Sequence, residues 1–375
     1  MKPIKTIILL LFFCLFCAFP VCAEETDDFY REQLRNSGID EIQDAVPPTA
    51  REYFSENGID LYDENWISSF TAENIFSHIR RFLKEGAAAP LAAGGALLAV
   101  ILIAAAIHAA EPKRTSADTA EYAAAIASAI LVLLPAVSVI RSSIDALKGI
   151  SVFLLSFIPV FAVITAAAGG AATAASMSAL LLTAAEGVSA FSSFVISPLM
   201  GGYLALSISA AVSPVVKKSG LAEAVKKISL WGMGLISTVF TAILGIQTAV
   251  NAPADTLTMK TAKFIVGSAV PMAGSALSEA LSTIRASMGF LRSSVGIYGA
   301  AVCLLTFLPL ILELLLWRAV MLAGSAAAEL FSLSGIGGIL KAMDAMLAVL
   351  TGILLLVGAM FIICLAVVIA AGRAA

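Results

Sequence analysis

Charged side chains inside long apolar runs are the residues of this sequence best placed to do chemistry. A charge is costly in lipid, so such residues face other protein or a wet cavity. There they can relay protons or ions, or pair as contacts between helices. The strongest candidates are Lys263, Glu279, Arg285, Arg292 and Glu313. Three further residues, Glu186, Arg318 and Glu329, carry the same two interpretations.

Four lysines form a second charged feature, a basic loop. Lys217, Lys218, Lys226 and Lys227 are accompanied by one acid, Glu223. Loops rich in Lys and Arg stay on the cytoplasmic side of a membrane. We therefore expect this loop inside the cell, where it can recruit cytoplasmic partners.

The sequence holds few groups suited to catalysis. The chain has 2 histidines, His78 and His108, and His108 is expected at a membrane interface. The spacings of metalloproteases, serine hydrolases, intramembrane aspartyl proteases and phosphate-binding loops are missing. Of the 5 cysteines, only Cys303 and Cys364 lie beyond the first 23 residues, and both fall in apolar runs. The sequence therefore predicts no catalytic, cofactor-binding or metal site.

The composition is that of a membrane protein. Of 375 residues, 60% are hydrophobic and 13% are charged, and the mean hydropathy is +0.97. In soluble globular domains, roughly a quarter of the residues are charged. The net charge is −3, and we expect no strongly basic surface that could neutralise a run of phosphates. Nucleic acid is therefore not an expected partner.

The N-terminal part divides into a leader and an acidic exported segment. Residues 1–23 resemble a signal peptide, because Lys2 and Lys5 precede a short apolar run that Pro20 ends. The alternative is an uncleaved first transmembrane helix. Residues 24–86 follow with 15 acidic and 6 basic residues, a net charge of −9.

The exported segment is expected to form several short helices. The last of them should begin after Thr71, because Thr is a favoured helix cap. Apolar residues recur on one face from Ile75 to Leu83. About 60 residues make a marginal domain, so this face is expected to pack on the membrane surface or on a partner protein.

The remaining residues predict an all-α polytopic membrane protein with about 7–8 transmembrane helices and a hairpin. The first two transmembrane helices are expected within residues 87–140, followed by a polar break over 141–148. Two membrane units should follow, over 148–250 and 262–370. One span is expected to run outward before residue 251, and another is expected to return after residue 294. Between these two spans, Phe264 to Ser294 is predicted to form a re-entrant or interfacial helical hairpin, because its charges are too dense for lipid.

The two membrane units contain a possible parallel tandem repeat. Ala175-Ser176-Met177 and Pro198-Leu199 return as Ala286-Ser287-Met288 and Pro309-Leu310 without a gap between them. Further on, Ser219-Gly220 returns as Ser334-Gly335. Parallel repeats of this kind occur in transporters.

One stretch carries a resemblance to a known family. Lys263 to Ala280 reads KFIVGSAVPMAGSALSEA and resembles the signature of the stage III sporulation protein AE family. The order of leader, acidic exported segment and many spans is similar to that family as well, as are Leu308-Pro309-Leu310 and Ser334-Gly335. The family pattern implies no catalytic or ligand residues.

The resemblance implies a role in endospore formation. It implies a multi-pass component of the mother-cell membrane around the forespore, with residues 24–86 in the space between the two membranes. Expected partners are other stage III sporulation proteins, including an ATPase and ring-forming subunits, a forespore partner protein, and membrane lipid. Together they would form a channel or secretion-like complex in which the hairpin from Lys260 to Arg292 is the leading functional element.

Two rival functions remain open from the sequence. A stand-alone secondary transporter would place its site between the repeats, near Pro159 and Pro271, because proline-broken helices often line transporter sites. A membrane scaffold would use the spans only to anchor the exported segment and to recruit partners through the basic loop.

These charge patterns predict a topology. Residues 24–86 and 251–294 should lie outside, and residues 111–119 and 217–227 inside. A cysteine introduced at Ala222 should therefore resist membrane-impermeant maleimide added to intact cells, whereas one at Ser69 should react. Labelling of position 222 from outside would contradict the topology.

Overall fold

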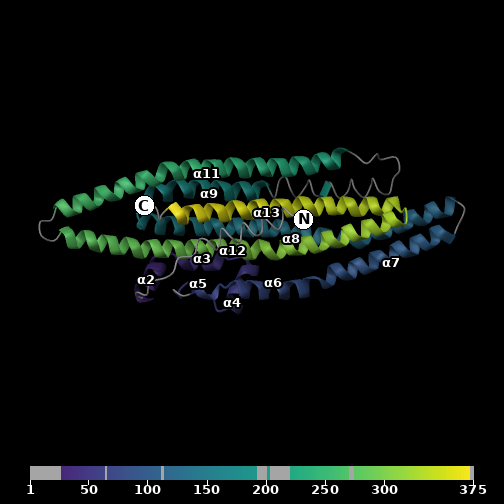
Figure 1. Cartoon of the computed structure of the whole chain (residues 1–375), viewed down its shortest axis with the longest axis horizontal. Coiled ribbons are helices and arrows are strands. Elements are labelled where there is room, and N and C mark those ends of the chain that lie inside the picture. Colours follow the sequence, from purple (N-terminus) through teal and green to yellow (C-terminus); the bar gives the residue numbers. More distant parts are fainter. Residues whose placement is uncertain are drawn as a thin grey trace.

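The computed structural model describes the chain over residues 27–63, 66–110, 114–191, 201–202, 220–269 and 274–371. These residues form a bundle of helices that run along one long axis, and no strand occurs among them (Figure 1). The predicted all-α polytopic class is confirmed, since six described helices are long and apolar enough to cross a membrane. The predicted signal peptide, together with Lys217 and Lys218, lies outside the described residues.

The segment over residues 24–86, which the sequence predicts to be exported, contains five short helices among its described residues. They are α2 (Asp27–Ser37), α3 (Ile39–Ala45), α4 (Pro48–Glu56), α5 (Trp66–Ser69) and α6 (Ala72–Gly86). Gly38, with a φ of 83°, separates the first two, because a left-handed conformation there suits glycine. Thr71 caps α6 as predicted, since its side chain accepts a hydrogen bond from the Asn74 amide at 3.3 Å.

Among the described residues, six longer helices form the membrane body. They are α7 (Ala88–Ala110), α8 (Arg114–Ala167), α9 (Ala171–Phe191), α11 (Gly220–Ala269), α12 (Gly274–Leu330) and α13 (Ser334–Ala371). The ends of α11 and α12 extend beyond the other helices at one end of the bundle (Figure 1). The predicted hairpin, Phe264 to Ser294, comprises only the last residues of α11 and the first residues of α12, and its connecting residues lie outside the described ranges. Its re-entrant or interfacial position stays a prediction.

The predicted break at residues 141–148 is wrong, because α8 continues through it. Arg141, Asp145 and Lys148 are spaced by four and three residues, and all three are exposed on one face. Their charges can therefore be solvated without ending the helix. α13 begins at Ser334, the second of the repeated Ser-Gly landmarks, whereas Ser219 of the first lies outside the described residues. The tandem repeat nevertheless stays a prediction.

The bundle is longer than a bilayer is thick. α8 has 54 residues and α12 has 57, which corresponds to about 80 to 85 Å at the rise of an α-helix. The hydrocarbon core of a bilayer is only about 30 Å thick. A large part of the bundle must therefore lie outside lipid.

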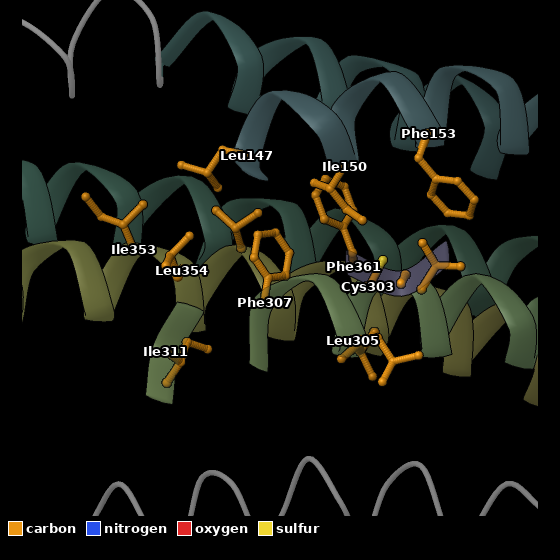
Figure 2. Packing of buried hydrophobic residues seen from close by; sticks show 14 of the residues in the cluster. Leu147, Ile150, Phe153, Cys303, Leu305, Phe307, Ile311, Ile353, Leu354 and Phe361 are labelled. Atoms are coloured by element: carbon orange, nitrogen blue, oxygen red, sulfur yellow. The ribbon is translucent and has the colours of Figure 1, made fainter. Parts of the chain in front are cut away.

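The core forms where α12 meets α8 and α13. Gly299 lies so close to Phe157 that an added Cβ would be 2.6 Å from the ring, and a Cβ added at Gly296 would be 2.8 Å from Ile369. Figure 2 shows side chains of the three helices converging there. The labelled examples are Leu147, Ile150 and Phe153 from α8, Cys303, Leu305 and Phe307 from α12, and Ile353, Leu354 and Phe361 from α13.

The exported segment docks on the same helices. The buried Trp66 indole donates a hydrogen bond to the Ser294 hydroxyl at 2.9 Å. Phe54 stacks on Tyr298 with ring centroids 4.9 Å apart. The same segment also contacts α8, against which α3 packs. The segment is thus built into the bundle through aromatic side chains.

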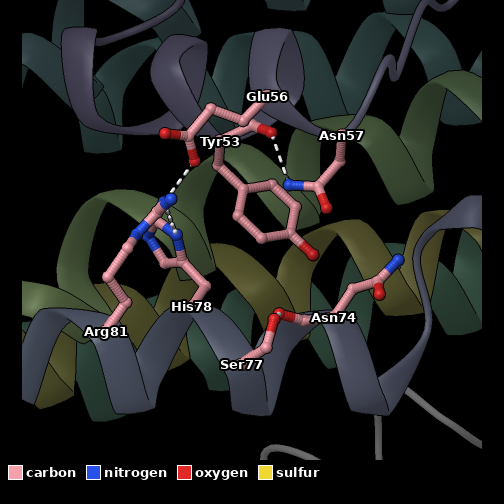
Figure 3. Close-up of polar contacts among 7 residues, drawn as sticks. All are labelled: Tyr53, Glu56, Asn57, Asn74, Ser77, His78 and Arg81. Atoms are coloured by element: carbon pink, nitrogen blue, oxygen red, sulfur yellow. Dashed lines mark hydrogen bonds and ion pairs between the residues drawn. The ribbon is translucent and has the colours of Figure 1, made fainter.

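The apolar face of α6 packs on the chain's own α12, where Ile79 and Phe82 line a small hollow with Pro309. Across the segment, α4 is tied to α6 by an ion pair between Glu56 and Arg81 (Figure 3). The Arg81 hydrogen bond lowers the pKa of Glu56. The apolar face therefore needs neither lipid nor a partner at these positions.

The close approach at Gly299 generates a test. Gly299→Ala should lower the free energy of unfolding by about 1 to 3 kcal/mol, because an extra methyl forces a packed core apart. Thermal unfolding of the purified protein in detergent measures the change. Gly187→Ala on α9 is the matched control, since an added methyl there meets no atom within 4 Å. Equal melting temperatures for both variants would contradict this account of the core.

Candidate functional site

The structure separates the five predicted membrane charges along α11 and α12. Lys263 lies in α11, and Glu279 is exposed near the start of α12. Arg285 is half-buried, and Arg292 is 3% exposed. Glu313 is half-buried farther along α12 and accepts a hydrogen bond from the Trp317 side chain. Only Arg285 and Arg292 come together, at the turn between α8 and α9.

An acidic residue from α11 caps the start of α9. The Asp255 carboxylate accepts hydrogen bonds from the Ala172 amide at 2.8 Å and the Thr173 amide at 3.2 Å. It also accepts one from the Thr173 hydroxyl at 2.6 Å. The first amides of a helix lack partners within the helix and carry partial positive charge. Asp255 is only 4% exposed, and these amides and the hydroxyl supply the hydrogen bonds that its buried carboxylate needs.

Basic residues from α12 lie against the other side of the same turn. Arg285 Nε donates a hydrogen bond to the Ala168 carbonyl at 3.1 Å, just beyond the end of α8. An added Cβ at Gly170 would lie 3.7 Å from Arg292 Nη1, so this guanidinium also borders the turn. The carbonyls that end a helix carry partial negative charge and favour a cation.

We call this arrangement the α8–α9 clamp. It consists of the turn residues Ala168, Gly170, Ala172 and Thr173 with Asp255, Arg285 and Arg292. An acid meets the positive end of one helix and a base meets the negative end of the other. The clamp joins the α8–α9 pair to the α11–α12 hairpin and needs no bound ligand to do so.

The sequence reasoning identified Arg285 and Arg292 but missed Asp255. A signal was present, because Asp255 is the only acidic residue between Glu223 and Glu279. A lone acid in a long apolar helix is expected to have a specific partner. Its partners, however, lie 82 and 83 residues earlier in the chain, and no local pattern connects the two places.

Two further charged pairs join α12 to α13. Arg318 Nε donates to Asp344 at 2.9 Å, and both side chains are largely covered. Lys341 pairs with Glu329 at the end where these helices meet. Of the two interpretations of Arg318 and Glu329, the geometry supports contacts between helices.

The other predicted residues remain apart from these contacts. Lys227 is exposed near the start of α11, and Lys226 lies in the same helix. Pro159 lies within the continuous α8, on its exposed side, and Pro271 is outside the described residues. His108 is exposed at the end of α7. Among the described residues, no contact supports a binding site at the basic loop or a transporter site near Pro159.

Among the described residues, no group of three or more His, Cys, Asp or Glu side chains could hold a metal ion. Cys303 and Cys364 are free and buried. The polar contacts described between the long helices include a helix cap, a carbonyl contact, ion pairs and a hydrogen bond from the Asn251 amide to the Ser176 hydroxyl, and each of them links two helices. Fold and contacts define a multi-pass helical membrane protein.

Comparison with known proteins identifies the family. The sequence profile described as stage III sporulation protein AE matches residues 63–372, most of the chain. The chain therefore belongs to the stage III sporulation protein AE family, which has a sporulation-related role and is not a known enzyme family.

A relative supports the same assignment. The chain is similar to "Stage III sporulation protein AE" of Bacillus subtilis (strain 168), with 27% identity over 133 residues. The aligned part covers 36% of this chain and 33% of the relative, so the match spans about a third of the relative's length. No solved structure matches the chain.

The clamp generates a stability test. Asp255→Ala should lower the free energy of unfolding by about 1 to 3 kcal/mol, because a helix loses its cap and buried amides lose their acceptor. Thermal unfolding in detergent reports the loss. Thr258→Ala, an exposed change on the same helix, should leave the midpoint nearly unchanged. Identical midpoints for the two variants would mean that the carboxylate contributes nothing to holding α9.

Proposed function

We propose that this protein is a non-enzymatic membrane component of the mother-cell to forespore channel or secretion-like complex that endospore formation requires. The observation that carries the proposal is the family match over residues 63–372. The match includes the end of the docked exported segment and nearly the whole membrane body. A sporulation protein with this many apolar helices is suited to work in a membrane.

The proposed location is the mother-cell membrane that surrounds the forespore, with residues 24–86 in the space between the two membranes. The net charge of −9 on these residues supports an aqueous location. Their docking through Trp66 and Phe54 supports a fixed position relative to the bundle. A domain held in this way offers a defined surface toward a second membrane.

The proposed partners are other stage III sporulation proteins, including an ATPase and ring-forming subunits, and a forespore protein. The end of the α11–α12 hairpin is the proposed contact on the outer side, because it extends beyond the other helices (Figure 1). Lys260 and Glu279 are exposed there and are available to a partner. The basic loop around Lys227 is the proposed contact on the cytoplasmic side.

Deletion of the gene in its own organism tests the proposal. Vegetative growth should be normal, and engulfed forespores should fail to mature, because the mother cell can no longer support them. A fluorescent fusion of the full chain should restore spores and gather around the forespore. A nutrient or ion defect during growth would instead favour a stand-alone transporter.

Two charge reversals in the complementing copy make the test specific for the hairpin. Glu279→Lys should reduce heat-resistant spore counts, because it alters an exposed charge near the proposed contact. Glu186→Lys is the matched control, since Glu186 is equally an exposed acid but lies on α9. Full spore formation with Glu279→Lys would remove the hairpin as the functional element.

A further inference from the structure

One side of α11 carries a row of polar side chains toward α9. Gln247, Asn251 and Asp255 follow one another at intervals of four residues, so they lie on the same side of the helix. The Asn251 amide donates a hydrogen bond to the Ser176 hydroxyl, and the Asp255 carboxylate accepts one from the Thr173 hydroxyl. The row therefore faces the first turns of α9. We call its three residues the α11 polar row.

Lipid is expected to cover a different side of α11. Residues Gly234–Thr258 form one of the six candidate membrane spans among the described helices. Val239, Ile246 and Leu257 are exposed on the side away from α9. α9 and α11 are nevertheless the least apolar of the six candidate spans. Because lipid donates no hydrogen bonds, the polar row needs protein or water as its partner.

The protein satisfies the two ends of the row unequally. The Asp255 carboxylate receives three hydrogen bonds from the start of α9. Gln247 Oε1 is buried as well, but it accepts no hydrogen bond from any described residue. A buried carbonyl without a donor is costly. Asn251 lies between the two and donates to Ser176, and a side-chain amide offers further donors and acceptors.

The contact between the two helices becomes apolar beyond Gln247. On α11, Leu244 is 1% exposed and Phe240 is 7% exposed. On α9, the residues buried farther along the helix are Leu181, Ala185 and Val188. From Asp255 to Gln247, α11 rises by about 12 Å, at the rise of an α-helix. The α9–α11 contact thus consists of a short polar stretch next to the clamp and an apolar stretch after it.

We propose that water occupies the α9–α11 contact around Asn251 and Gln247, inside a candidate membrane span. A water beside Gln247 Oε1 donates the hydrogen bond that this carbonyl needs, and the Asn251 amide gives the same water a second polar partner. Both amide residues are only half-buried, which leaves room for water beside them. Asp255 closes the site at one end and Leu244 closes it at the other, because each is almost fully buried. The site is therefore a short hydrated stretch between two closed ends.

Cysteine accessibility in isolated membranes tests the proposal, which does not depend on the proposed function. Cys14, Cys17 and Cys22 are first replaced by serine, while the buried Cys303 and Cys364 stay. Single cysteines are then introduced along α11 in the full chain. The membranes are treated with a small charged methanethiosulfonate, and the rate of modification is measured at each position.

Gln247→Cys and Asn251→Cys should react about tenfold or more faster than two controls, because an apolar environment suppresses the reactive thiolate. Leu244→Cys is the control for the dry part of the same contact. Ile246→Cys is the control for the lipid-facing side at the same height, since this residue is 66% exposed away from α9. Equal rates at positions 246 and 247 would overturn the proposal, as would no reaction at positions 247 and 251.

A second variant tests the water site without a cysteine. Gln247→Leu should not raise the melting temperature of the purified protein in detergent, because water already satisfies the Gln247 carbonyl. Without water, the unpaired carbonyl would destabilise the native protein, and leucine would remove that cost. A higher melting temperature for Gln247→Leu would overturn the proposal, even where the cysteine variants fail to fold.

Discussion

The close packing of α12 is the constraint on which the rest of the structure depends. α12 contacts α7, α8, α11 and α13 in the body and α4 and α6 in the exported segment. Gly296 and Gly299 let α8 and α13 approach it more closely than any side chain would permit. Small residues serve this purpose in membrane proteins, where water does not drive helices together. One long helix therefore positions both the membrane body and the exported segment.

Charges in this protein are placed where helix ends or other charges compensate them. At the turn between α8 and α9, Asp255 accepts hydrogen bonds from the first amides of α9, and Arg285 donates one to a carbonyl just beyond the end of α8. Arg318 pairs with Asp344 between the neighbouring helices α12 and α13. Each contact satisfies groups that would be costly to leave alone away from water. The same residue types in a transport pathway would need access to water and freedom to change partners. The contacts seen here fix helices relative to one another.

The two parts of the bundle differ in character. α7 is long, strongly apolar and largely exposed, whereas residues 24–86 carry a net charge of −9. Trp66 and Ser294 join the acidic segment to α12 through a buried hydrogen bond, so this segment is not a separate tethered domain.

Composition and periodicity alone determined the class of this protein, the acidity of residues 24–86 and the cap at Thr71. These properties are local, because hydropathy, charge and helix capping depend on residues within a few positions. The continuity of α8 through Arg141 was not predictable, since only the exposed face of the folded helix shows that its charges need no break. Likewise, Asp255 appears in the sequence as an isolated acid, and only the tertiary structure brings it to Thr173. Contacts between residues far apart in the chain depend on how whole helices pack, and the sequence pattern of one helix does not contain that information.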